Sequence, residues 1–174
     1  VIVKQIPASR PKIQAELIKA AGQRKISDAA NVLLKTARSS ERNVKLESIK
    51  ALRTTAKADD LSAFLAVASG LKSKAFLNEA EKTIAVLALM KTQPSQKTAD
   101  VINAIDSAGK NTDLKIMLYQ ALGRIGDDSG LKALYDGLNS RNKDIKLVCC
   151  RTLANWSTAA PADVLAETAE KDRN

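Results

Sequence analysis

The sequence contains no histidine, and this excludes imidazole chemistry from the chain. Histidine is the commonest general base in enzymes, a frequent metal ligand and the usual partner of a nucleophilic Ser or Cys. Acidic residues lie close together at Asp59–Asp60, Glu79–Glu81 and Asp127–Asp128, and we expect them at turns or helix starts, where carboxylates cap free N–H groups. A Ca²⁺ or Mg²⁺ site needs more converging oxygens than such pairs supply. The sequence therefore predicts a non-enzymatic protein with no catalytic residue, no metal site and no cofactor.

Aromatic residues, glycine and proline are also scarce. Aromatic residues make up 3% of the sequence, which has seven glycines and four prolines. Hydrophobic residues nevertheless reach 45%, with Ala and Leu prominent among them. Small and unbranched side chains favour helices over sheets. The prolines, at positions 7, 11, 94 and 161, lie outside the helical patterns or at their starts, where proline is tolerated. An all-α fold is therefore predicted.

Long hydrophobic runs are absent as well. A run such as Ile84–Met90 is far shorter than the roughly 20 residues that span a bilayer, so we expect no membrane span in this segment. The chain begins Val-Ile-Val-Lys, without an initiator Met or a signal-peptide pattern. We therefore expect a fragment of a longer protein, and the start of the chain gives no information about the compartment.

A short pattern recurs along the chain. An apolar residue, a variable residue, a small residue and a second apolar or small residue end at positions 21, 52, 87, 122 and 153. These positions are 31, 35, 35 and 31 residues apart, and Ile49-Lys50-Ala51-Leu52 is one example. Recurrence at this interval is typical of solenoid proteins, whose units stack because none can bury its apolar face alone.

Each repeat predicts two antiparallel helices joined by a short turn. The predicted first helices span about 10–23, 42–57, 74–91, 113–125 and 143–156, and the second helices about 27–38, 60–71, 95–107, 128–138 and 162–171. We expect one domain, 1–174, made of units at about 10–40, 41–72, 73–109, 110–140 and 141–174. The predicted architecture is a right-handed α-α superhelix of about five helix pairs.

Three motifs carry a resemblance to a known family. Residues 121–127 read Ala-Leu-Gly-Arg-Ile-Gly-Asp. Residues 42–52 and 143–153 share a second pattern: Arg or Lys, then Asn or Asp, an apolar residue and Lys, with Leu at the end. These segments resemble the first helices of HEAT and HEAT-like, or armadillo-like, repeats. Taken with the repeat length, the resemblance to this family covers nearly the whole chain. The third unit, 73–109, departs from the pattern because it lacks the Asp or Asn and the Arg or Lys of the motif.

A narrower likeness lies at the two ends. Residues 16–24 and 153–165 are similar to HEAT domains of large multidomain bacterial proteins that also carry a 3-keto-disaccharide hydrolase-like domain. Those proteins are commonly exported. The resemblance implies a periplasmic or extracellular location, and a role as an accessory domain of a carbohydrate-active multidomain enzyme.

Positive charge is concentrated in the first third of the chain. The sequence has 28 Lys and Arg against 19 Asp and Glu, a formal net charge of +9. Residues 1–57 hold 13 basic against four acidic residues, a surplus of nine, and residues 58–174 hold 15 of each sign. This basic segment is either an electrostatic footprint for nucleic acid or an acidic partner, or a set of solvated helix faces. The basic patch we single out consists of Lys19, Arg24, Lys35, Arg38, Lys45 and Lys50.

The preferred functional interpretation is a non-catalytic protein–protein interaction or scaffolding module. It would bind a protein, or another domain of the same chain, on a concave surface formed by successive second helices. Helical phase selects the candidate binding residues Asn31, Lys35, Asn103, Lys132 and Asp136. An alternative is a nucleic-acid-binding solenoid that uses the basic first two repeats.

The two cysteines are adjacent, at positions 149 and 150. The repeat aligns Cys150 with Ile18, Ile49 and Ile84, which indicates a core position. A disulfide between neighbours is strained, and a redox or metal role favours a Cys-x-x-Cys spacing. We therefore expect both thiols to be free and buried as small apolar side chains.

Overall fold

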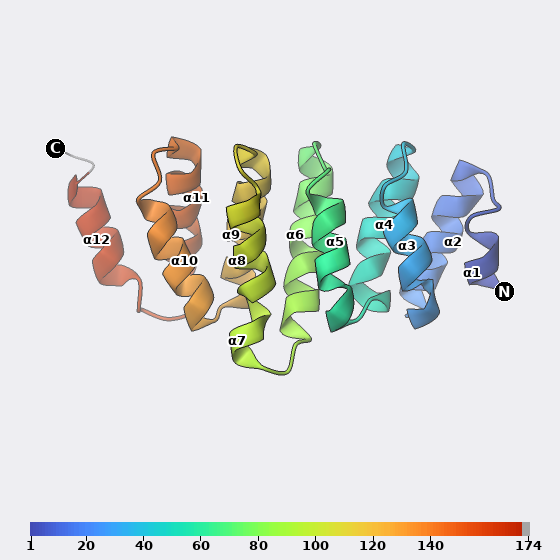
Figure 1. Ribbon diagram of the computed structural model, residues 1–174, viewed down its shortest axis with the longest axis horizontal. Coiled ribbons are helices and arrows are strands. Elements are labelled where there is room, and N and C mark those ends of the chain that lie inside the picture. Colours follow the sequence, from blue (N-terminus) through green and yellow to red (C-terminus); the bar gives the residue numbers. More distant parts are fainter. Residues whose placement is uncertain (172–174) are drawn as a thin grey trace. The chain divides into compact units, whose positions relative to one another are not determined.

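The computed structural model describes residues 1–171, with the backbone alone at 94, 95 and 171 (Figure 1). Every regular element in this range is helical, and no strand occurs there, which confirms the predicted all-α class. The right-handed superhelix of about five helix pairs stays a prediction. No helix among the described residues is long and apolar enough to cross a membrane.

The helices form two compact units. Unit 1 is Val1–Lys91 and unit 2 begins at Thr92. The boundary falls inside the third predicted repeat, 73–109, between its two helices. The helices of unit 1 are α1 Ile2–Gln5, α2 Pro11–Gln23, α3 Ala30–Thr36, α4 Arg42–Thr55, α5 Leu61–Ala68 and α6 Lys74–Leu89. Those of unit 2 are α7 Pro94–Lys97, α8 Ala99–Ser107, α9 Thr112–Ile125, α10 Asp128–Leu138, α11 Lys143–Ala154 and α12 Ala162–Lys171.

Unit 1 consists of two layers of helices. In one layer α4 packs between α2 and α6, and in the other α3 contacts α5. The layers meet where α3 packs on α4 and α5 on α6, and Figure 1 shows α3 in front of α4 and α5 in front of α6. Ile18, Ile49 and Ile84 occupy equivalent repeat positions in α2, α4 and α6, and all three are fully buried. The periodic apolar positions therefore form the core between the layers, as the repeat predicts.

Unit 2 has a similar arrangement. Helix α9 packs beside α11, α8 packs on α9, and α10 contacts both α9 and α11. Leu118 and Leu122 of α9 and Leu134 of α10 are fully buried between them. Helix α12 packs on α11.

Local chemistry accounts for several helix ends. Gly126 ends α9 with φ of 71°, a left-handed conformation that glycine adopts without a Cβ penalty. Asp127 is the N-cap of α10, and its Oδ1 accepts a hydrogen bond of 2.7 Å from the N–H of Gly130. Asp60 accepts one of 2.8 Å from the N–H of Lys57. These contacts confirm the capping role expected for two of the acidic pairs.

The third acidic pair was placed wrongly. Glu79 and Glu81 lie in the middle of α6 rather than at a turn or helix start, although the start of α6 at Lys74 agrees with the predicted helix 74–91. Two further differences concern helices. The predicted helix 95–107 breaks at Thr98 into α7 and α8, and the four-residue α1 was not predicted.

Candidate binding surfaces

The five residues predicted to form a binding surface are all exposed. Asn31 and Lys35 lie one turn apart on α3 in unit 1. In unit 2, Asn103 lies on α8, and Lys132 and Asp136 lie one turn apart on α10, which packs against α8. All five residues therefore belong to second helices, as helical phase predicts. Whether they bind a partner stays a prediction.

The basic charge follows the division into units. Residues 1–91 contain 17 Lys and Arg against eight Asp and Glu, so unit 1 carries a formal charge of +9. Residues 92–174 contain 11 of each sign and carry no net charge. The entire surplus of the chain therefore belongs to one compact unit.

The six residues of the predicted basic patch do not form one cluster. Lys19 and Lys50 line the same groove between α2 and α4. Arg24 lines a separate hollow of about 600 Å³ beside the first four residues of the chain. Lys45 lies over the ring of Phe76, with its Nζ 5.3 Å from the ring centroid. The other two members, Lys35 and Arg38, are exposed at and just after the end of α3.

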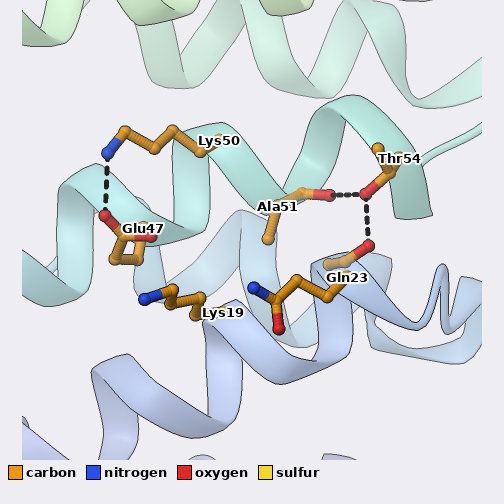
Figure 2. A pocket seen from close by; sticks show the side chains of 7 residues that line it. Lys19, Gln23, Glu47, Lys50, Ala51 and Thr54 are labelled. Carbon is orange, nitrogen blue, oxygen red and sulfur yellow. Dashed lines mark hydrogen bonds and ion pairs between the residues drawn. The ribbon is translucent and has the colours of Figure 1, made fainter.

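The groove between α2 and α4 has small residues at its floor and polar residues on its walls (Figure 2). Its volume is about 250 Å³, and its seven lining residues are Lys19, Gly22, Gln23, Glu47, Lys50, Ala51 and Thr54. Gly22 and Ala51 are buried, whereas Lys19 and Gln23 are exposed. Lys50 Nζ contacts Glu47 Oε1 at 2.9 Å. All the lining residues come from α2 and α4, so the groove belongs to the layer of first helices.

Sequence reasoning missed an ion-pair network between α4 and α6. Arg53 Nη2 donates hydrogen bonds to Glu79 Oε2 at 2.7 Å and to the carbonyl oxygen of Glu79 at 3.2 Å. Lys82 Nζ donates to Glu79 Oε1 at 2.8 Å. A signal was present in the sequence, because Arg53 occupies the repeat position held by Gly22 and Gly123 in the first and fourth repeats. A charged residue where other repeats have glycine indicates a local departure from the common packing.

The network alters the acidity of Glu79. Burial raises its pKa, but the hydrogen bonds from Lys82 and Arg53 and the positive charges of these residues outweigh that effect. The pKa of Glu79 therefore lies below its ordinary value, and the carboxylate stays charged at neutral pH. We interpret the network as a structural link between two first helices.

The two cysteines are free, but their burial differs from the prediction. Cys149 is fully buried, and Cys150, which was assigned to the core, is only partly buried. Burial, together with the neighbouring Cys150 sulfur, raises the pKa of the Cys149 thiol to about 12. Cys149 faces Gly137, where an added Cβ would collide with the Cys149 sulfur. In α11, therefore, the side chain at position 149 faces the core more fully than the side chain at position 150.

No group of three His, Cys, Asp or Glu side chains within residues 1–171 could hold a metal ion. No protein-family model matches the chain, and no curated protein matches it. The likeness to HEAT and HEAT-like repeats therefore stays an interpretation of the sequence pattern, and so does the narrower likeness to exported multidomain proteins.

Proposed function

We propose that this chain is a non-catalytic binding module that holds another polypeptide on exposed polar faces of its second helices. The observation that carries the proposal is the exposure of all five candidate residues, from Asn31 on α3 to Asp136 on α10. In both units the second helices pack on the first helices through their apolar sides. The five candidate residues lie on the exposed sides of these helices.

A repeat protein suits this role because each repeat packs against the repeats next to it. The apolar residues of the repeats lie inside, so exposed residues can change without loss of the fold. Three of the five candidates are charged and two are amides, which suits hydrogen bonds and ion pairs to a polypeptide. The HEAT-like pattern of the sequence supports the same function, since such repeats commonly bind proteins.

Site-specific photo-crosslinking tests this proposal. A photo-reactive amino acid replaces Asn31 or Asn103 on the second helices, and Asn78 on the first helix α6, which does not line the groove between α2 and α4, serves as the matched control, since all three are exposed asparagines. In an extract of cells that express the protein, we expect one specific crosslinked polypeptide from the second-helix positions and none from the control. Equal crosslinking from both layers, or none from either, would contradict the proposal.

Nucleic-acid binding is a second candidate function, and the concentration of charge in unit 1 favours it. Titration of the chain with duplex DNA over a salt series tests it. If DNA is the partner, the logarithm of the binding constant falls by about 0.9 per contacted phosphate for each tenfold rise in salt. Replacing Lys35 and Arg38 by Gln would then reduce this slope. A chain that fails to bind duplex DNA at low salt would exclude this candidate.

A further inference from the structure

The groove between α2 and α4 combines a narrow backbone approach with two cationic side chains. Its floor is narrow because a Cβ at Gly22 would lie 2.9 Å from the Cβ of Ala51, closer than real Cβ contacts. Lys19 on α2 and Lys50 on α4 stand on opposite walls (Figure 2). The two lysines occupy equivalent positions of the first and second repeats, 31 residues apart. The stacking of two repeats therefore brings two positive charges to one groove.

We propose that this groove binds an extended, acidic segment of polypeptide. The proposal goes beyond the function argued above, because the groove lies on first helices and contains none of the second-helix residues assigned there. Charge complementarity supports it, since unit 1 carries the whole surplus of nine positive charges. Lys50 is already paired with Glu47, whereas Lys19 makes none of the described ion pairs. Lys19 is therefore available to a carboxylate of the ligand.

The chemistry of the walls favours a polypeptide over a nucleic acid. Lys19, Lys50 and the Gln23 amide can donate hydrogen bonds, and the Glu47 carboxylate and the Gln23 carbonyl can accept them. A peptide backbone offers both acceptors and donors, which match both kinds of wall group, but a phosphodiester backbone offers only acceptors. Single-stranded nucleic acids are also held by aromatic stacking. Phe64 and Phe76, the aromatic residues of unit 1, are both buried.

The dimensions fit a short segment. The lining residues of α4 run from Glu47 to Thr54, which is about 12 Å of helix. An extended peptide of about four residues spans that length. A segment with two or three acidic residues can thus place carboxylates near both lysines while its backbone lies along the small floor residues Gly22 and Ala51.

Fluorescence anisotropy with the whole chain tests the proposal. The probe is a labelled peptide of about eight residues, composed of Glu, Ser and Gly, and its counterpart with Gln for every Glu is the neutral control. We expect saturable binding of the acidic peptide alone. The K19Q/K50Q variant should bind about tenfold more weakly, since two screened charge contacts of about 0.7 kcal/mol each are lost. The K72Q/K74Q variant loses the same charge at exposed positions outside the groove and should bind with unchanged affinity.

A variant that should gain affinity provides a second test, because a misfolded variant would lose affinity and not gain it. Glu47→Gln frees Lys50 from its ion pair and removes a negative charge from the wall, so it should bind the acidic peptide several-fold more tightly. Glu41→Gln makes the same charge change at the N-cap of α4, outside the groove, and should have no effect. If a groove variant and its control outside the groove changed the affinity equally, for the lysine pair or for the glutamate pair, the proposal would be overturned. Binding would then follow net charge alone. If single-stranded DNA displaced the labelled peptide at a lower concentration than the unlabelled acidic peptide does, the proposal would be overturned in favour of a nucleic-acid ligand.

The two proposals fail separately. Loss of the photo-crosslinks at Asn31 and Asn103 would leave the groove result unchanged, because no residue of α3 or α8 lines the groove. Absence of peptide binding would likewise leave the second-helix surface untouched.

Discussion

The Thr54 hydroxyl donates a hydrogen bond of 2.8 Å to the backbone carbonyl oxygen of Gly22, and this contact joins the C-terminal turns of α4 and α2. The same hydroxyl lies 3.1 Å from the carbonyl oxygen of Ala51 in its own helix. The bond to Gly22 can form because the backbones approach closely where Gly22 faces Ala51. The hydrogen bond and the missing side chain thus belong to one contact between repeats.

Replacing Thr54 by Val should lower the free energy of unfolding by about 1 kcal/mol, because it removes a hydrogen bond between helices while keeping the side-chain volume. Thr55→Val is the matched control, since the Thr55 hydroxyl bonds only to Ala51 within its own helix and the side chain is buried. That variant should be neutral or slightly stabilising. Urea unfolding followed by circular dichroism measures both. A loss at Thr55 as large as that at Thr54 would show that the contact between helices has no special role.

Gly22 and Gly123 occupy the same repeat position, and they should respond differently to alanine. At Gly22 the new methyl group would meet the Cβ and the Cα of Ala51, which cannot rotate away. At Gly123 it would meet the Cγ2 of Thr152, which can. Overpacking costs about 1–3 kcal/mol, against a gain of about 1 kcal/mol in helix propensity.

We therefore expect Gly22→Ala to destabilise the protein and Gly123→Ala to be close to neutral. Thr152→Ala removes the obstructing methyl group, so Gly123→Ala should be stabilising in that background. Denaturant midpoints of the four variants test the argument. Gly123→Ala could instead be as destabilising as Gly22→Ala, both in the wild-type protein and in the Thr152→Ala variant. That result would show that rotation of Thr152 does not relieve the contact.

The network around Glu79 predicts a dependence of stability on pH. The pKa of Glu79 is lowered in the folded protein, so its contribution is complete above the unfolded value of 4.5 and is lost as the pH falls through the folded pKa. Glu79→Gln should lower the stability at pH 7 and reduce its decrease below pH 4.5.

Lys82→Gln is the control, because Lys82 is the more exposed of the two cations paired with Glu79, at 42% against 27% for Arg53. It should have a smaller effect than Glu79→Gln at neutral pH. Unfolding midpoints at several pH values measure the difference. Parallel pH profiles for wild type and Glu79→Gln would contradict the assigned ion pair.

The two thiols should react at very different rates with a disulfide reagent. Cys149 is fully buried and its pKa of about 12 keeps it protonated, so it should react only after unfolding. Cys150 is partly exposed and should react in the folded protein. The Cys149→Ser and Cys150→Ser variants assign the two phases. Fast reaction of the chain that retains only Cys149 would contradict the burial of that side chain.

Asp127 should contribute more to stability than its neighbour Asp128. Its carboxylate accepts hydrogen bonds from the N–H of Gly130 and, at 3.0 Å, from the hydroxyl of Thr98. Asp127→Ala removes an N-cap and should cost about 1–2 kcal/mol. Asp128→Ala removes only a charge near the helix N-terminus and should cost about 0.5 kcal/mol. Fluorescence of Trp156, the one tryptophan of the sequence, reports unfolding of unit 2. Equal losses would argue against the cap.

Much of the fold could be predicted because its signals are local. The predicted helices 128–138 and 162–171 agree with α10 and α12, and the end of α9 follows from a glycine in the left-handed conformation. The exposure of the five candidate surface residues also followed from helical phase alone. These features depend on residues a few positions apart, which the sequence displays directly.

Other features required the packing of helices that are distant in sequence. The repeat alignment places Cys150 in the core, but the contact of α10 with α11 at Gly137 buries Cys149 fully, and Cys150 is only partly buried. The pairing of Arg53 with Glu79 depends on the register between α4 and α6, and a one-residue shift would separate them. The groove with Lys19 and Lys50 depends on the approach of α2 to α4 at Gly22. The sequence by itself thus determined where the helices lie and which faces are apolar, because these properties arise from neighbours along the chain. Only the tertiary structure decided which side chains meet across helices, because a rotation or shift of a few ångströms changes those contacts without changing the pattern.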